Sequence, residues 1–472
     1  MIHSYLDHTK DTKNCEGVPP VRWLIFLLRK LHIYELFEKY AQDGRERRGI
    51  YSIASLLMVA LEMLLFRSPS KNDFYQNKKL GRGAFYRNLG EIAHIKGKRF
   101  PHSKTIDDAF LALNPSDLEP ILFDIFKALC SAKLFSNHPS LKGYWDYRLS
   151  IDAFYTHYYP VLSQHPCEVC PFCLKRTRET TEGQTKVWYV HSEVVATLIF
   201  ENGFQLPLCV HRIRKRREWE RLNEDDLKQE CEQTALPLVL ATIRTYLPKL
   251  KITALLDGLH ANQTSIEALK RFGFGWDIVL KRLKSVKEEI DPIGSIVQRS
   301  VASKRFNLTQ TACFANDLFY CDHSLNAIKF HEHAQKKSSR RFAKINSKDI
   351  HYQWIVSKII DKTNLFGLIE EARLRWQVED LINTLKNRGL NIKHDYSRHP
   401  SCQTIWKILT FLAFCLTAIF LLSDLGIKAR KGATISFLMR QMLQDLFYLS
   451  HETIFLCSYP KQLRFSLWAG AS

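Results

Sequence analysis

A run near the C-terminal third of the chain carries residues that could act on phosphates. Within residues 372–388, Arg375, Glu379 and Lys386 are spaced so that they share one side of a helix at about 100° per residue. A carboxylate between two cations on one stripe could bind a metal ion while its neighbours hold phosphates. The spacing alone favours an ordinary amphipathic helix with surface charges, whose other side carries apolar residues such as Leu381.

Two further carboxylates lie at predicted strands. Asp152 is in the expected strand 148–155, and Asp257 directly follows the short apolar strand 252–256. Ligand sites form at strand ends in parallel α/β sheets, and a helix packed against that edge can add a third carboxylate such as Glu379. Oxygen ligands suit Mg²⁺, with Mn²⁺ as a substitute, and two such ions could activate a water or a 3′-hydroxyl. The alternative is that the three carboxylates are caps or surface charges.

Three cysteines lie close together between the first two predicted strands. Cys167, Cys170 and Cys173 form two overlapping CxxC steps, a spacing that suits zinc ligands. A fourth ligand is needed, for which His165 and His191 are candidates, and the expected set includes His191. A cysteine-bearing loop without metal is the alternative.

The balance of charge favours a polyanionic partner. The chain of 472 residues has a formal charge of +20, and its basic residues occur in bunches. Each neutralised phosphate releases counterions, so bunched positive charge favours nucleic acid over a membrane surface or general solubility. Candidate contacts to a DNA backbone are Arg375, Lys386, Lys281, Lys284, Arg214 and Arg216.

The expected location is a reducing cytoplasm. The 12 cysteines are mostly scattered, and the N-terminus lacks a charged-then-apolar signal segment. The strongest candidate for a membrane span is residues 408–422, which is shorter than the roughly 18 to 20 residues that a bilayer requires. We therefore expect this segment to be a helix buried within the protein, and no membrane partner.

The predicted elements divide the chain into three parts. The apolar spacing of residues 1–137 predicts a helical domain that could bind DNA or serve in packing and assembly. Residues 431–472 are predicted to form a helical tail. Residues 138–430 form the third part. There, three strands, a helix and then strand–helix–strand follow the order of an RNase H-like core, and a β-rich insertion is expected at about 285–350. The fold class expected is therefore α/β.

The run at 372–388 also resembles a known signature. It is similar to the Tyr-x2-Arg-x3-Glu-x6-Lys motif of bacterial insertion-sequence transposases of the DDE class, with Arg375, Glu379 and Lys386 at the matching positions and Ala372 in place of the Tyr. The segment Ser-Ile-Asp ending at Asp152 resembles the family's first-Asp strand, and Leu-Asp-Gly-Leu around Asp257 resembles its second-Asp segment.

The resemblance implies a function that composition cannot give. It implies a transposase that binds the terminal inverted repeats of an insertion sequence, cleaves the ends and joins 3′-hydroxyls to target DNA. Asp152, Asp257 and Glu379 would then hold two Mg²⁺ ions, and a homodimer would join two ends in the bacterial nucleoid. The alternatives are an inactive DNA-binding derivative, which the departure at Ala372 leaves open, and a membrane protein anchored by residues 408–422.

Overall fold

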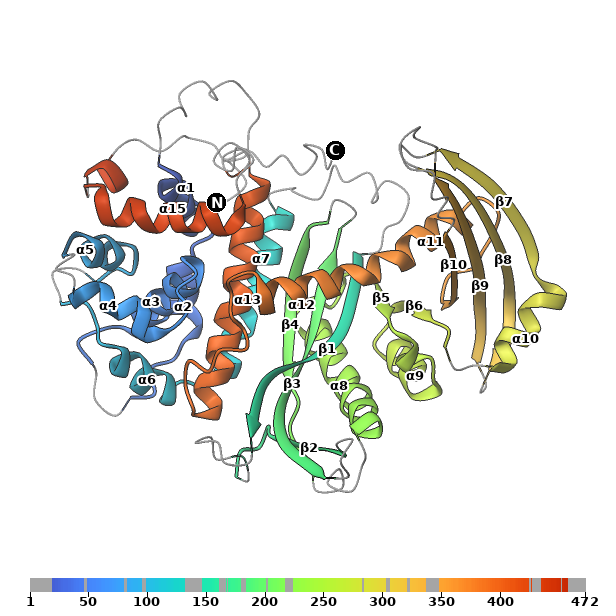
Figure 1. Cartoon of the computed structure of the whole chain (residues 1–472), viewed down its shortest axis with the longest axis horizontal. Helices are drawn as coiled ribbons and strands as arrows, with labels where there is room; N and C mark the ends of the chain where they lie inside the picture. Colours follow the sequence, from blue (N-terminus) through green and yellow to red (C-terminus); the bar gives the residue numbers. More distant parts are fainter. Residues whose placement is uncertain are drawn as a thin grey trace.

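The computed structural model of the chain combines helices with one extended mixed sheet, which confirms the predicted α/β class (Figure 1). Its described residues are 19–456, except for 46–48, 80–82, 96–98, 132–146, 161–166, 168, 180–183, 201–202, 217–223, 282–283, 303–305, 321–322, 337–347, 424–425, 427–433 and 451.

The N-terminal part is helical, as predicted. Its helices are α1 (Pro20–Lys30), α2 (Ile33–Tyr40), α3 (Ile53–Leu65), α4 (Lys71–Lys79), α5 (Gly83–Ile92), α6 (Ser103–Leu111) and α7 (Pro120–Ser131). Every residue of α3 is buried, including Ser55 and Glu62, because its sequence is otherwise apolar and the other helices surround it. The Ser52 hydroxyl caps this helix by accepting a hydrogen bond from the Ser55 N–H at 3.0 Å.

The sheet contains all ten strands of the described chain. They are β1 (Tyr147–Pro160), β2 (Leu174–Glu179), β3 (Thr185–Ile199), β4 (Gln205–Arg212), β5 (Ile252–Leu256), β6 (Gly275–Val279), β7 (Ser295–Ala302), β8 (Phe306–Tyr320), β9 (His323–Lys336) and β10 (Lys348–Val356). Their order is β2-β3-β1-β5-β6-β10-β9-β8-β7, and β4 also pairs with β3. The parallel pairs are β1 with β5 and β5 with β6. All five residues of β5 are buried, as expected for a central parallel strand.

The hairpin predicted at residues 202–203 joins β3 to β4. Asn202 lies outside the described residues, but Gly203 has a φ of +80°, a conformation that glycine adopts without steric cost. The Phe200 N–H donates to the Phe204 carbonyl at 3.0 Å and closes the turn. The helices α8 (Glu224–Tyr246) and α9 (Gln263–Arg271) then connect β4 to β5 and β5 to β6, in the predicted order.

The β-rich segment predicted near residues 285–350 forms strands β7–β10, and helix α10 (Lys284–Ile293) precedes them. These strands extend the main sheet, because β10 pairs antiparallel with β6 through Trp354 and Val279. They curve away from the centre at the far end of the molecule (Figure 1). A second apolar core lies here, between β8–β10 and helix α11 (Leu365–Arg373), and includes Phe330, Trp354 and Leu368.

A long C-terminal helix joins the helical part to the sheet. Helix α13 (Pro400–Leu422) packs against α3 and α6 on one side and β4 on another, and α15 (Ile435–Tyr448) packs against α1 and α5. At 23 residues α13 is longer than the predicted segment and has the length and composition to cross a membrane. However, 78% of its most apolar window is buried inside the protein, as expected for a core helix.

Candidate functional site

The first two predicted carboxylates lie at the same level of adjacent strands. The parallel register of β1 and β5 pairs Ser150 with Leu255, so Asp152 and Asp257 each lie two residues beyond this pair. Since side chains alternate along a strand, Asp152 shares the face of β1 that carries Ser150. Asp257 directly follows β5 and caps a short 3₁₀ helix (Gly258–His260), where its carboxylate accepts a hydrogen bond from the Leu259 N–H at 2.9 Å.

The third carboxylate approaches from a helix across this face. Residues 372–388 are helical, as predicted, but a 3₁₀ turn (Leu374–Trp376) separates α11 from α12 (Gln377–Asn387). The Arg375 carbonyl accepts a hydrogen bond from the Ser150 hydroxyl at 3.4 Å, which holds the turn against β1 two residues before Asp152. Glu379 follows in the first turn of α12 and is 51% exposed.

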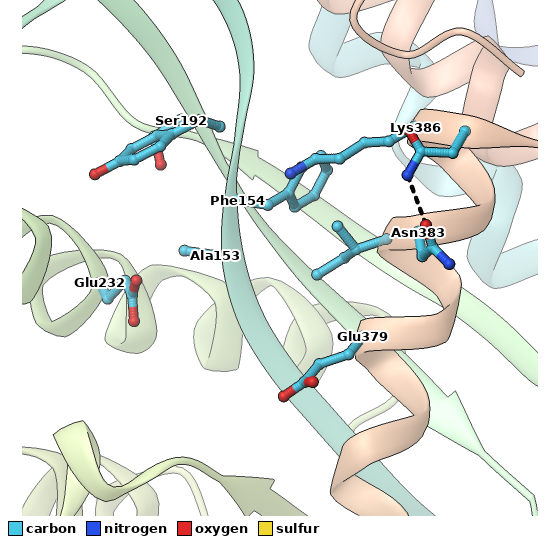
Figure 2. Close-up of a pocket in the computed structure, with 10 residues that line it drawn as sticks. Ala153, Phe154, Ser192, Glu232, Glu379, Asn383 and Lys386 are labelled. Atoms are coloured by element: carbon cyan, nitrogen blue, oxygen red, sulfur yellow. Dashed lines mark hydrogen bonds between the residues drawn. The ribbon is translucent and has the colours of Figure 1, made fainter.

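A cavity opens between α12 and the sheet. It has a volume of about 380 Å³, and its lining includes Glu379, Lys386, Phe154, Ser192 and Glu232. Figure 2 shows the Glu379 side chain extending from α12 toward β1, with Glu232 on the far side of that strand. Asp152 and Asp257 adjoin this space next to Ala153 and Glu232 but do not line it, and the three predicted carboxylates do not form a group with all ligand atoms within 4.8 Å of one another. We call the space together with Asp152 and Asp257 the carboxylate cavity.

Two further residues lie beside Asp257. Ligand atoms of Glu232, Asp257 and His260 are all within 4.8 Å of one another, a grouping that could hold a metal ion. Glu232 is charged and lies in a helix, where an exposed position is usual, but it is only 6% exposed. The signal was present in the sequence. Glu232 precedes Leu236, Val239 and Leu240 of α8 at helical spacing, on the face that is buried.

Arg375 and Lys386, the two predicted DNA contacts of this run, lie in different surroundings. The Arg375 guanidinium is 7% exposed, donates to the Glu379 carboxylate at 3.1 Å and lies over the Trp376 ring, so in this structure it positions the carboxylate. Lys386 lines the cavity with its ammonium 5.3 Å from the Phe154 ring centre. Burial and nearby Lys393 lower the pKa of Lys386, whereas Asp152 acts in the opposite direction.

The remaining predicted DNA contacts are more scattered. The stem of Lys281 packs so closely on Gly258 that a β-carbon there would lie 2.6 Å from its Cγ, which places Lys281 beside Asp257. Arg214 and Arg216 are exposed after β4. Lys284 begins α10, but its side chain lies outside the described residues.

Ala372, which stands where the signature has Tyr, is buried in the structure. This residue is 3% exposed and belongs to the second core, among side chains of β8–β10 and α11. A neighbouring ion pair fixes the same stretch: buried Glu371 contacts the Arg148 guanidinium at 3.2 Å and the Lys358 ammonium at 3.5 Å. The side chain at position 372 therefore packs inside the protein.

The cysteines and one candidate histidine come together at the β2–β3 end of the sheet. Cys170 and Cys173 Sγ lie 3.5 Å and 3.1 Å from His191 Nε2, and Cys167 joins the same buried apolar cluster. Hydrogen bonding with Cys170 and burial raise the pKa of the Cys173 thiol, and burial lowers the pKa of His191 to about 3. His165 lies outside the described residues. We call Cys167, Cys170, Cys173 and His191 the cysteine cluster.

A network of buried charges surrounds the cysteine cluster. The Arg212 guanidinium donates to His191 Nδ1, to the Gln403 side chain at 2.7 Å and to the Pro400 carbonyl at 2.8 Å. Next to it, Lys407 of α13 forms an ion pair with fully buried Glu193 of β3. These contacts attach the cysteine end of the sheet to α13.

No protein-family model matches the chain, and a comparison with curated proteins also gave no match.

Proposed function

We propose that the chain is a DDE transposase that cleaves the ends of an insertion sequence and joins them to target DNA. The observation that carries the proposal is the position of Asp152 and Asp257 on or directly after the paired strands β1 and β5, beside a cavity that Glu379 of α12 lines. The order β1, β3, β4, α8, β5, α9, β6 supports an RNase H-like core, and the β7–β10 segment then stands as its insertion. The resemblance at Arg375, Glu379 and Lys386 and the charge of +20 point the same way.

The donor set of the cavity fits Mg²⁺. Three carboxylates supply the oxygen ligands that this ion prefers, and the exposure of Glu379 leaves room for water and phosphate. When bound, Mg²⁺ would supply Lewis-acid chemistry that activates a water or 3′-hydroxyl and stabilises the leaving oxygen. The chain's own residues would divide the remaining tasks: Arg375 holds Glu379 in place, and Lys386 and Lys281 offer positive charge to phosphates at the edge of the cavity.

The transposase would act as a homodimer on two element ends in the bacterial cytoplasm, at the nucleoid. A second candidate keeps the fold without catalysis: an inactive DNA-binding derivative. Ala372 packs inside the second core, so any DNA contact that the family's Tyr would make is absent here. This observation favours the inactive derivative.

Cleavage of labelled element-end DNA in Mg²⁺ separates these candidates. Purified protein should nick the duplex at the element end with Mg²⁺ or Mn²⁺, and chelation should stop the reaction. Binding of the same DNA without any cleavage in either metal would instead support the inactive derivative.

A further inference from the structure

The geometry of the cysteine cluster fits a tetrahedral metal centre. Zinc bonds of about 2.3 Å to sulfur and 2.0–2.1 Å to nitrogen place neighbouring ligand atoms roughly 3.5 Å apart. The Cys170 Sγ to His191 Nε2 distance is 3.5 Å, and the distance from Cys173 Sγ is 3.1 Å, a few tenths of an ångström shorter. Cys170, Cys173 and His191 have ligand atoms within 4.8 Å of one another, and Cys167, 6% exposed in the same apolar cluster, would supply the third sulfur.

The surroundings hold the histidine in a ligating orientation. A guanidinium can only donate, so its hydrogen bond from Arg212 fixes Nδ1 of His191 as the acceptor and turns Nε2 toward the sulfur atoms. Metal binding through Nε2 of a neutral imidazole requires the ring proton to be on Nδ1, so Arg212 would give up this one hydrogen bond and keep those to Gln403 and Pro400, while the thiol protons leave to solvent. Zinc with three thiolates has a net charge of about −1, and the buried Arg212 beside the imidazole offsets it.

The cysteine loop also contacts the exposed basic segment 214–216. The Lys215 N–H donates to the carbonyl of Pro171, which follows Cys170 directly, at 2.8 Å. The next residue, Phe172, has the guanidinium carbon of Arg212 4.2 Å and that of Arg214 5.7 Å from its ring centre. A ligand that holds Cys170 and Cys173 in place therefore also holds the loop residues between them, which the basic segment 214–216 contacts.

We propose that Cys167, Cys170, Cys173 and His191 bind one Zn²⁺ ion, and that this centre anchors the exposed basic segment 214–216 for contact with a nucleic-acid backbone. Three thiolates and an imidazole are ligands that suit zinc, whereas Mg²⁺ prefers oxygen. The metal centre itself is independent of the proposed function. The role of the basic segment rests on that function, since it presumes a DNA substrate.

Metal analysis of the purified full-length protein tests the centre. Wild type should carry about one zinc per chain, and Co²⁺ should replace it with a thiolate-to-metal absorption band. Cys173→Ser should lose both signals, and Cys402→Ser, at an equally buried cysteine in α13, should keep them. Folded wild-type protein that contains no zinc and gives no such band on Co²⁺ titration would overturn the proposal, even if Cys173→Ser fails to fold.

Binding to a duplex of unrelated sequence, without Mg²⁺, tests the role of the basic segment. In zinc-loaded protein, the double variant Arg214→Ala/Arg216→Ala should reduce the slope of log K against log salt by up to about 1.8, since two phosphate contacts are lost. The reduction should be smaller after zinc is removed by a chelator. An unchanged slope in loaded protein that binds DNA overturns the role of the segment. Zinc-loaded protein that binds no DNA overturns that role and the proposed function, and leaves the metal centre standing.

Discussion

The carboxylate cavity and the cysteine cluster lie on the same sheet in opposite surroundings. Glu379 is 51% exposed on a helix that crosses an open cavity, whereas Cys170 is 1% exposed inside an apolar cluster. Oxygen ligands that remain open to solvent leave space for a substrate, and closed sulfur ligands do not. The difference indicates that the cavity suits chemistry and the cluster suits structure, and it makes separable predictions for variants at each.

The largest effect is expected at the open site. Glu379→Gln should lower cleavage of element-end DNA by at least roughly a thousandfold, because it removes a charge that the metal needs while keeping the shape of the side chain. Gel-shift affinity and thermal stability should stay close to wild type, since Glu379 is half exposed. Asp380→Asn, at the exposed neighbouring acid, is the matched control. Wild-type cleavage in Glu379→Gln would remove this residue from the site.

The next effect is expected on stability, at the network beside the cysteine cluster. Lys407→Met should lower the free energy of unfolding by about 3 kcal/mol, because it breaks the buried ion pair with Glu193. Urea unfolding measures this. Adding Glu193→Gln to the same chain should recover part of the loss, since the buried carboxylate, left with Arg212 and Thr156 as partners, is then replaced by a neutral amide. A stability loss that is equal in the double variant would show that packing, not charge, is responsible.

A smaller effect is expected at the residue that joins the cavity from α8. Glu232→Gln should raise the Mg²⁺ concentration needed for half-maximal cleavage by about tenfold, because Glu232 lies within ligand distance of Asp257. A titration of cleavage rate against Mg²⁺ checks this, and zinc content should not change. If the Mg²⁺ requirement is unaltered, Glu232 is a buried structural acid.

The smallest effect is expected at Lys386. Lys386→Ala should weaken binding to element-end DNA and reduce the slope of log K against log salt by about 0.9, the value for one lost phosphate contact. Lys249→Ala is the control, because this exposed lysine lies near the opposite end of β5 from Asp257. An unchanged slope would leave Lys386 as a cation that only offsets the charge of Asp152.

The sequence predicted the local features well and the long-range ones poorly. Alternation and apolar runs located β1, β3 and β5, because these patterns depend on neighbouring residues. The burial of Arg375 and its contact with Glu379 depend on a 3₁₀ turn seated on β1, which spacing on an ideal helix does not reveal. The register that aligns Asp152 with Asp257 likewise follows from the pairing of strands that are about a hundred residues apart in the chain. The tendency of ligand sites to form at strand ends was the one indication of it in the sequence.

The position of α13 has a consequence for any duplex that contacts both parts of the molecule. This helix is packed into the N-terminal helices and into the sheet at once, and one apolar core runs through all three. The N-terminal helices therefore cannot pivot freely about the carboxylate cavity. In a transposase built this way, the protein would fix the distance between the DNA sequence bound by those helices and the bond that is cut. That distance would be a constant number of base pairs.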